Sequence, residues 1–139
     1  MIKKSYEIEN LYNNYNFYLF YGKNNGAKKE EIEKFILSNK NKILSKYHEK
    51  YILTNSESFL TEIYSGSLFE DEKIIIINSA TDKILKIFEE IYSKKDLKIS
   101  IIIETDNLEK KSKLRNLFEK EKELICVPFY PDTNETLSK

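Results

Sequence analysis

The chain of 139 residues has the size of one domain built around a single sheet. Its composition, with 40% hydrophobic and 33% charged residues but Gly 3 and Pro 2, excludes disordered, collagen-like and linker-dominated chains. The chain has 23 Lys and Arg residues and 23 Asp and Glu residues, so its formal net charge is zero. The broad basic surface of a dedicated nucleic-acid binder is therefore not expected.

Apolar runs of strand length alternate with segments of helical period, which predicts parallel strands joined by crossover helices. The first strand is expected at residues 17–21 (FYLFY), and turn-prone residues follow it. A helix is predicted to begin near Ala27. The face that would pack on the sheet consists of Ile32, Phe35, Ile36 and Ile43.

A second strand with its own helix is expected next. The strand is placed at residues 51–54, and Thr54 with Glu57 would form a capping box that opens the helix. The apolar stripe of this helix includes Phe59 and Ile63, and Gly66 is predicted to end it.

Two β-branched runs predict the centre of the sheet. Residues 73–77 and 99–103 hardly alternate, which is typical of parallel strands that are covered on both faces. An apolar stripe over residues 84–91 predicts the helix between them. Asp106 and Glu109 are expected to cap the helix after the second run.

Residues 124–127 are predicted to add a fifth strand, and residues 131–139 form a polar tail with the composition of a linker. The predicted fold is therefore a three-layer α/β/α domain at residues 1–130. It has a mostly parallel five-stranded sheet and P-loop-like topology.

The loop after the first strand stands where a phosphate-binding loop would lie. Aligned on Gly22, the pattern GxxxxGK[ST] puts Ala27 at the second glycine, Lys28 at the lysine and Lys29 at the hydroxyl residue that would hold magnesium. We therefore predict a degenerate, non-functional phosphate loop, with weak anion binding as the alternative. Its residues are Gly22, Lys23, Asn24, Asn25, Gly26, Ala27, Lys28 and Lys29.

Other features of an NTPase are also missing from the sequence. A carboxylate is expected after a neighbouring strand, but Asn78 and Ser79 follow residues 73–77. We predict no catalytic residue, no metal site and no cofactor. Glu104 and Asp106 follow a strand at the edge where ligands often bind.

The remaining candidates for chemistry favour ordinary structural roles. His48, the single histidine, has no nucleophile near it in the sequence and is interpreted as a surface residue. Cys126, the single cysteine, lies in a short apolar strand and is interpreted as a buried hydrophobe. A basic cluster is interleaved with acids, which favours a solvated helix face over a DNA contact; it consists of Lys110, Lys111, Lys113 and Arg115.

Residues 65–72 (SGSLFEDE) place two large apolar side chains, Leu68 and Phe69, after the expected helix end. In one interpretation they fold back as the apolar contact of a glycine-capped helix. In the other they form an exposed plug that fills a partner's pocket, as interface anchors do. The pattern alone favours neither.

Five pieces of the chain together resemble the N-terminal domain of the bacterial DNA polymerase III delta subunit. They are YLFYG, the degenerate loop, SLFEDEKIIII, ISIIIET and residues 106–114 (DNLEKKSKL). The resemblance covers nearly all of the chain. The SLF turn before an aliphatic strand and the D-x-L-x-K-x-S-K-L run are its most specific parts.

The resemblance implies an AAA+-like (RecA-type) domain without ATPase activity, and hence a clamp-loader subunit that binds and opens the sliding clamp during DNA replication. The family's apolar plug maps onto Ser67, Leu68 and Phe69. The implied partners are the sliding clamp and the other clamp-loader subunits, with DNA contacted weakly or indirectly. The family continues into lid and collar domains, so residues 131–139 are expected to begin a linker.

Two other functions stay open from the sequence. One is a small P-loop nucleotide-binding enzyme, which Lys29 at the hydroxyl position disfavours. The other is a nucleic-acid-binding module, which the balanced charge disfavours. A single cysteine and the charged N-terminus favour a cytoplasmic protein without a signal peptide, and the short apolar runs exclude membrane insertion.

Overall fold

In the computed structural model of the protein, the described residues are 1–12, 15–68, 72–94 and 98–130; of residues 5, 9, 10 and 66–68 only the backbone is described. The elements follow one another as η1 (Ser5–Leu11), β1 (Phe17–Tyr21), α1 (Asn25–Leu37), β2 (Ile43–His48), α2 (Glu49–Thr54), α3 (Ser56–Leu68), β3 (Lys73–Ala80), η2 (Asp82–Ile84), α4 (Leu85–Tyr92), β4 (Ile99–Thr105), α5 (Lys113–Lys120) and β5 (Leu124–Pro128).

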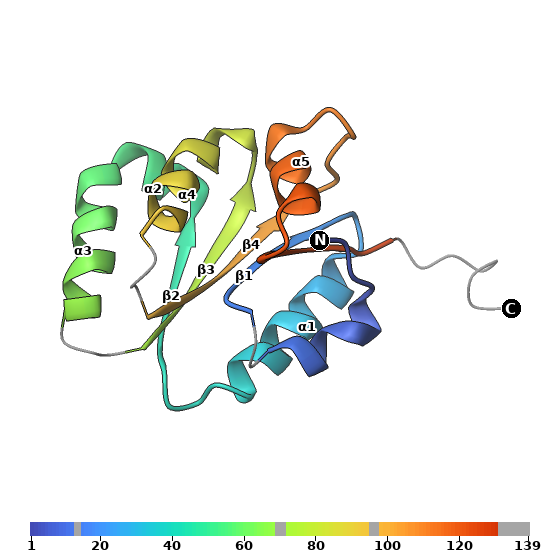
Figure 1. Ribbon diagram of the computed structural model, residues 1–139, viewed down its shortest axis with the longest axis horizontal. Coiled ribbons are helices and arrows are strands. Elements are labelled where there is room, and N and C mark those ends of the chain that lie inside the picture. The colour runs from blue at the N-terminus through green and yellow to red at the C-terminus, as the bar shows by residue number, and fades with distance from the viewer. Residues whose placement is uncertain (13–14, 69–71, 95–97, 131–139) are drawn as a thin grey trace, which may run out of the picture.

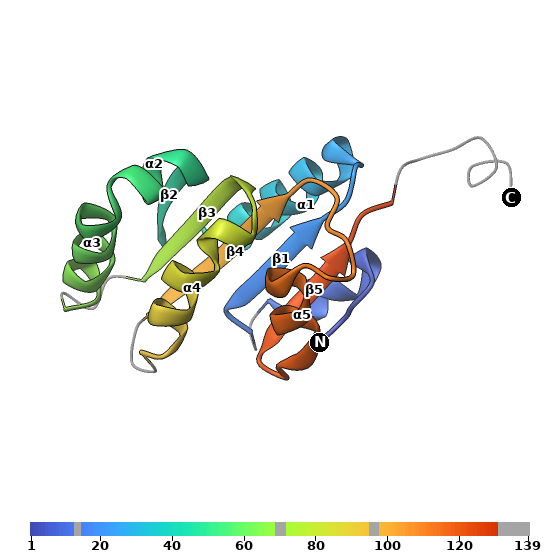
Figure 2. The same ribbon diagram turned by 90° about the horizontal axis from the view of Figure 1, so that it is seen from above.

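One five-stranded sheet has the strand order β2-β3-β4-β1-β5, and every pair of neighbouring strands is parallel. Figure 1 shows α1 on one side of this sheet and α2 to α5 on the other. Figure 2 shows the same ribbon turned by 90°, with α1 again on the other side of the sheet from α4 and α5. The protein is thus an α/β protein with alternating helices and strands, and its sheet, which the sequence predicts to be mostly parallel, is parallel throughout.

Each face of the sheet is closed by its own apolar layer. On the α1 side, Ile76 of β3 lies opposite Ile102 of β4, which lies opposite Tyr18 of β1. This row packs against Ile32 and Phe35 of α1. The other face packs against α2 to α5. Because β3 and β4 are covered on both faces, their isoleucines are fully buried, as the β-branched runs predict.

The second strand is the clearest error of the sequence-based assignment. Residues 51–54, expected as a strand, belong to helix α2, and Ile43, expected on a helix, begins β2. The cause is visible in the contacts: the carboxylate of Glu49, in the first turn of α2, accepts hydrogen bonds from the backbone and hydroxyl of Thr81 at 2.6 and 2.9 Å. A tertiary contact thus fixes a helix where the local pattern YILT suggests a strand.

Two predicted helix boundaries also differ. Thr54 ends α2, with its hydroxyl donating to the Lys50 carbonyl, so the capping box predicted with Glu57 does not form. Helix α3 continues through Gly66 to Leu68, so this glycine does not end the helix.

The helix after β4 begins later than Asp106 and Glu109 suggest. Its cap is Ser112, whose hydroxyl accepts from the backbone N–H of Arg115. Asp82, from η2, adds its carboxylate: it accepts from Ser112 Oγ at 2.5 Å and from the Lys113 N–H at 3.0 Å. A residue 30 positions away in the sequence therefore completes the cap.

Asp82 provides a pH-dependent contribution to stability. Burial opposes its charged form, but the hydrogen bonds from Ser112 and from the Lys113 and Leu114 amides outweigh burial and lower its pKa. Because the folded pKa is the lower one, this stabilisation is present above the unfolded value of about 4 and is lost as pH falls through the folded value. We expect Asp82→Asn to reduce the free energy of unfolding by about 0.5 to 1 kcal/mol at pH 7. In urea titrations the difference from wild type should shrink as the pH is lowered from 7 to below about 4. A constant difference over that range would contradict this assignment.

Cys126 is completely buried in β5, as its apolar surroundings predict. Burial, followed by the nearby Glu119 carboxylate, raises the pKa of its thiol to about 12. Since thiolate is the reactive form, we expect native protein to react with a thiol reagent at pH 8 at least about 100-fold more slowly than urea-unfolded protein. Equal rates in the two states, measured by absorbance, would contradict the burial.

Among the described helices, none combines the length and the apolar character that crossing a bilayer requires.

Candidate functional site

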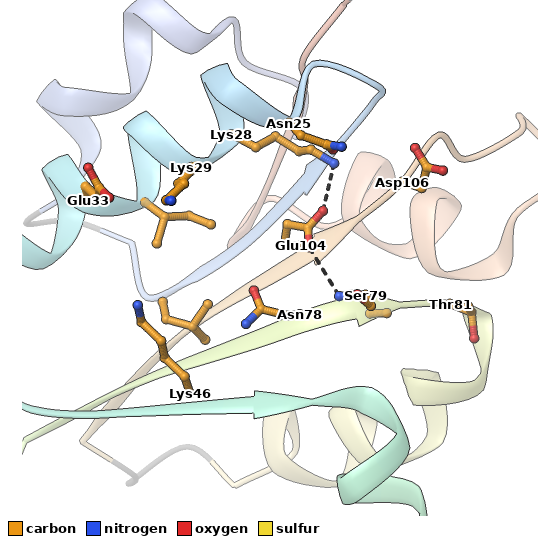
Figure 3. A pocket seen from close by; sticks show the side chains of 13 residues that line it. Asn25, Lys28, Lys29, Glu33, Lys46, Asn78, Ser79, Thr81, Glu104 and Asp106 are labelled. Carbon is orange, nitrogen blue, oxygen red and sulfur yellow. Dashed lines mark hydrogen bonds and ion pairs between the residues drawn. The ribbon is translucent and has the colours of Figure 1, made fainter.

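A cavity of about 650 Å³ opens at the carboxyl ends of β3 and β4, between these strands and α1 (Figure 3). This is the edge at which open α/β sheets commonly bind ligands. Its floor is apolar, from Ile32 and Ile76, and its walls are polar. The polar lining residues are Asn25, Lys28, Lys29, Glu33, Lys46, Asn78, Ser79, Thr81, Glu104 and Asp106.

A buried ion pair lies at the inner wall of the cavity. Lys28, in the first turn of α1, is 1% exposed, and its Nζ donates to Glu104 Oε2 at 2.7 Å and to the Thr105 carbonyl at 2.5 Å. A buried ammonium group is tolerated only when it is paired and hydrogen-bonded, and both conditions are met here. Lys28 is therefore committed to contacts within the protein.

The other oxygen of Glu104 contacts an unusual part of β3. Glu104 Oε1 accepts a hydrogen bond from the Ser79 backbone N–H at 3.2 Å, drawn as a dashed line in Figure 3. Ser79 has a φ of 57°, in the left-handed region that is uncommon for residues other than glycine, and the β3–β4 register shifts between Ile77 and Ala80. The irregularity turns this amide toward the carboxylate.

Five backbone amides of the loop after β1 and the start of α1 donate to protein oxygens. The N–H of Gly22 donates to the Asp106 carbonyl at 3.1 Å, and that of Asn24 donates to the Phe129 carbonyl at 3.4 Å. Three further N–H groups, those of Asn25, Ala27 and Lys28, donate to atoms of Lys23 and Asn24. A phosphate-binding loop needs its amides directed at the ligand, and in this loop these five are directed at protein oxygens.

The segment after β5 covers this loop. A Cβ atom added to Gly22 would lie 2.1 Å from the Phe129 carbonyl oxygen, and Gly22 has a φ of +121°. The Asn24 side-chain amide donates to the Tyr130 carbonyl at 3.1 Å. The chain that a phosphate would have to displace is therefore hydrogen-bonded in place.

The structure brings together several residues that the sequence singles out separately. One cavity is lined by residues of the predicted loop, of the end of β3 and of the end of β4: Asn25, Lys28, Lys29, Asn78, Ser79, Glu104 and Asp106. The other predicted loop residues do not line it: Gly22, Lys23, Asn24, Gly26 and Ala27. Lys29 is exposed at the rim. Within the described part of the chain, no group of acidic, histidine or cysteine side chains is arranged to hold a metal ion.

The buried Lys28–Glu104 pair and the strained Ser79 are the features that sequence reasoning missed. The position of Glu104 in the sequence could have indicated a site, since it directly follows an apolar run at the carboxyl edge of the sheet. The position of Lys28 is a weaker indication: Lys28 precedes Ile32 by four residues and therefore shares the buried face of α1.

The predicted clamp contact lies apart from the cavity. Ser67 and Leu68 are the last residues of α3, whose side chains there are not described, and Phe69 lies outside the described residues. Because α3 ends shortly before β3 begins, the backbone of Ser67 and Leu68 is at the amino edge of the sheet, opposite the cavity. The question of whether the apolar pair is exposed thus stays open as a prediction.

The basic cluster near α5 is partly used within the protein. Arg115 donates to Glu119 Oε2 at 2.9 Å and to the Leu108 carbonyl at 2.8 Å, and its guanidinium lies 4.9 Å from the Tyr21 ring centre. Lys111 pairs with Glu109 at 3.3 Å on an exposed surface. His48 is exposed, as predicted, and its Nδ1 accepts from the Lys50 N–H.

The fold and the cavity thus define an α/β protein with an all-parallel sheet and a polar cavity at its carboxyl edge. No protein-family model matches the chain, and no curated protein matches it.

Proposed function

We propose that this protein is a clamp-loader subunit of the delta type, an AAA+-like domain that binds and opens a sliding clamp without hydrolysing nucleotide itself. The proposed contact is formed by Ser67, Leu68 and Phe69. The partner is inferred from the sequence resemblance described above. The absence of nucleotide chemistry is inferred from the loop after β1.

The observation that carries the proposal is the occupied state of that loop. Its amides donate to protein oxygens, and residues 128–130 lie over Gly22 and Asn24. Lys28, at the position of the phosphate-contacting lysine, is buried against Glu104. These contacts give the loop after β1 a structural use, which supports the proposal of a domain that acts by binding proteins.

The proposed mechanism is a shift between two states of the clamp. The apolar side chains of Leu68 and Phe69 would fill a pocket on the clamp, as anchor residues do at interfaces. If the pocket is more accessible in the open ring, binding favours the open ring by the difference in affinity for the two states.

Capture of the clamp by immobilised protein tests the proposal. The sliding clamp of the same organism should be retained on the immobilised chain and eluted by free chain. A clamp that passes through at micromolar concentration, while the chain retains its native circular dichroism spectrum, would contradict the proposed partner.

The cavity favours a second candidate function, binding of a small polar ligand in the manner of a P-loop enzyme. Lys29 and Lys46 stand on its walls around an apolar floor, a combination found in ligand sites. Titration with fluorescent ATP and Mg²⁺ separates the two candidates. We expect no saturable ATP binding with a Kd below about 1 mM, which corresponds to a binding free energy of about −4 kcal/mol. A lower Kd would favour the nucleotide-binding enzyme.

A further inference from the structure

The carboxylate of Glu104 receives hydrogen bonds from two directions. The Lys28 ammonium donates to Oε2 at 2.7 Å, and the Ser79 amide donates to Oε1 at 3.2 Å. Figure 3 shows the carboxylate between these donors, one from α1 and one from the end of β3. Two donors from elements far apart in the sequence thus converge on one anionic group, which is how proteins commonly build a site for an oxyanion.

The charge at this position is required by the fold. The Lys28 side chain is 2% exposed, and its other hydrogen bond is donated to the neutral carbonyl of Thr105. An uncompensated buried ammonium is strongly destabilising, so an anion must occupy the position next to Lys28. The Ser79 amide, held by a left-handed backbone, adds a second donor to the same carboxylate.

The same position can be reached from outside. Unlike Lys28, the Glu104 side chain is 20% exposed, and it lines the cavity of about 650 Å³. A space of this size exceeds what an inorganic phosphate or formate ion needs. An external oxyanion could therefore contact Lys28 and Ser79 without unfolding the domain, were the carboxylate of Glu104 not there.

We propose that Lys28 and Ser79 form an oxyanion-binding site whose built-in occupant is the carboxylate of Glu104. The ligand class is a small oxyanion, carboxylate or phosphate, and in the wild-type protein Glu104 excludes it. The site differs from a phosphate loop because the donors are an α1 side chain and a β3 amide, while the amides after β1 are occupied. The inference is independent of the proposed clamp contact.

Chemical rescue of Glu104→Ala tests this site. Thermal unfolding is measured in about 20 mM formate or phosphate and in chloride of equal ionic strength. The variant should melt well below wild type in chloride, and each oxyanion should raise its melting temperature by roughly 5 °C or more, as binding near 1 mM predicts. Rescue by formate alone identifies a carboxylate site and rescue by phosphate alone a phosphate site; either supports the proposal. The melting temperature of the wild-type protein should be the same in formate, in phosphate and in chloride of equal ionic strength.

Two controls keep the test decisive. Glu33→Ala removes another carboxylate from the same cavity. In the described part of the chain Lys28 pairs with Glu104 and not with Glu33, so this variant should show no specific response to oxyanions. Lys28→Met/Glu104→Ala removes the buried charge as well and should regain stability while losing the response. If Glu104→Ala does not fold in chloride, folding restored by an oxyanion supports the site. Two results would overturn the proposal. In one, formate and phosphate raise the melting temperature of Glu104→Ala no more than that of Glu33→Ala. In the other, Glu104→Ala is unfolded in chloride and neither ion restores its folding.

Discussion

Replacement of Leu68 and Phe69 by alanine should reduce clamp binding at least about 100-fold, since each anchor side chain of an interface typically contributes 2 kcal/mol or more. The free energy of unfolding should change by less than about 2 kcal/mol, because side chains that stand in solvent contribute little to folding. Both values can be obtained from the same preparations, by surface-immobilised binding and by urea titration.

A matched variant shows whether the effect is specific to that segment. Tyr6 and Leu37 are large side chains that are 76% and 62% exposed, on η1 and α1. These elements cover the opposite face of the sheet from α3. Tyr6→Ala/Leu37→Ala should bind the clamp as wild type does. A Leu68→Ala/Phe69→Ala protein that loses more than about 3 kcal/mol of stability would instead assign the pair to the apolar core.

Gly22→Ala should be the most destabilising single substitution in the loop after β1. The added Cβ would meet the Phe129 carbonyl oxygen at 2.1 Å, a backbone atom that is itself held by hydrogen bonds to the loop. The φ of +121° is strained for any residue with a side chain. We expect the free energy of unfolding to fall by about 3 kcal/mol or more, measured by urea titration.

Gly26→Ala is the control for this substitution. Gly26 lies in the first turn of α1, and an added Cβ would have the Asn24 side-chain oxygen as its nearest neighbour at 3.8 Å. Alanine has the better helix propensity, so stability should be unchanged or rise by up to about 1 kcal/mol. Equal losses at Gly22 and Gly26 would mean that the segment after β5 does not pack on the loop as described.

The parts of the fold that the sequence predicts best are those with the least ambiguous burial. β3 and β4 are isoleucine runs between helices, and their identity as central parallel strands follows from the absence of alternation. β2 was missed because it is an edge strand with four of its six side chains exposed to solvent, including Ile43 and Leu44. Such a strand carries a weak periodic signal, and the apolar residues of α2 beside it carry a stronger one.

The site was predictable only in its location. Asn78, Ser79 and Glu104 directly follow apolar runs, and a sequence can therefore indicate that they lie at one edge of a parallel sheet. The pairing of Lys28 with Glu104 spans 76 positions and depends on how α1 packs over the sheet. The left-handed conformation of Ser79 accompanies the β3–β4 register shift, and no local sequence pattern predicts this conformation.

The most direct test of the central claim is a calorimetric titration of the sliding clamp with this protein, performed with and without ATP and Mg²⁺. A subunit that works through protein contact alone predicts saturable binding of equal affinity under both conditions, and no phosphate released. Binding that requires ATP, or turnover of ATP without any heat of clamp binding, would contradict it.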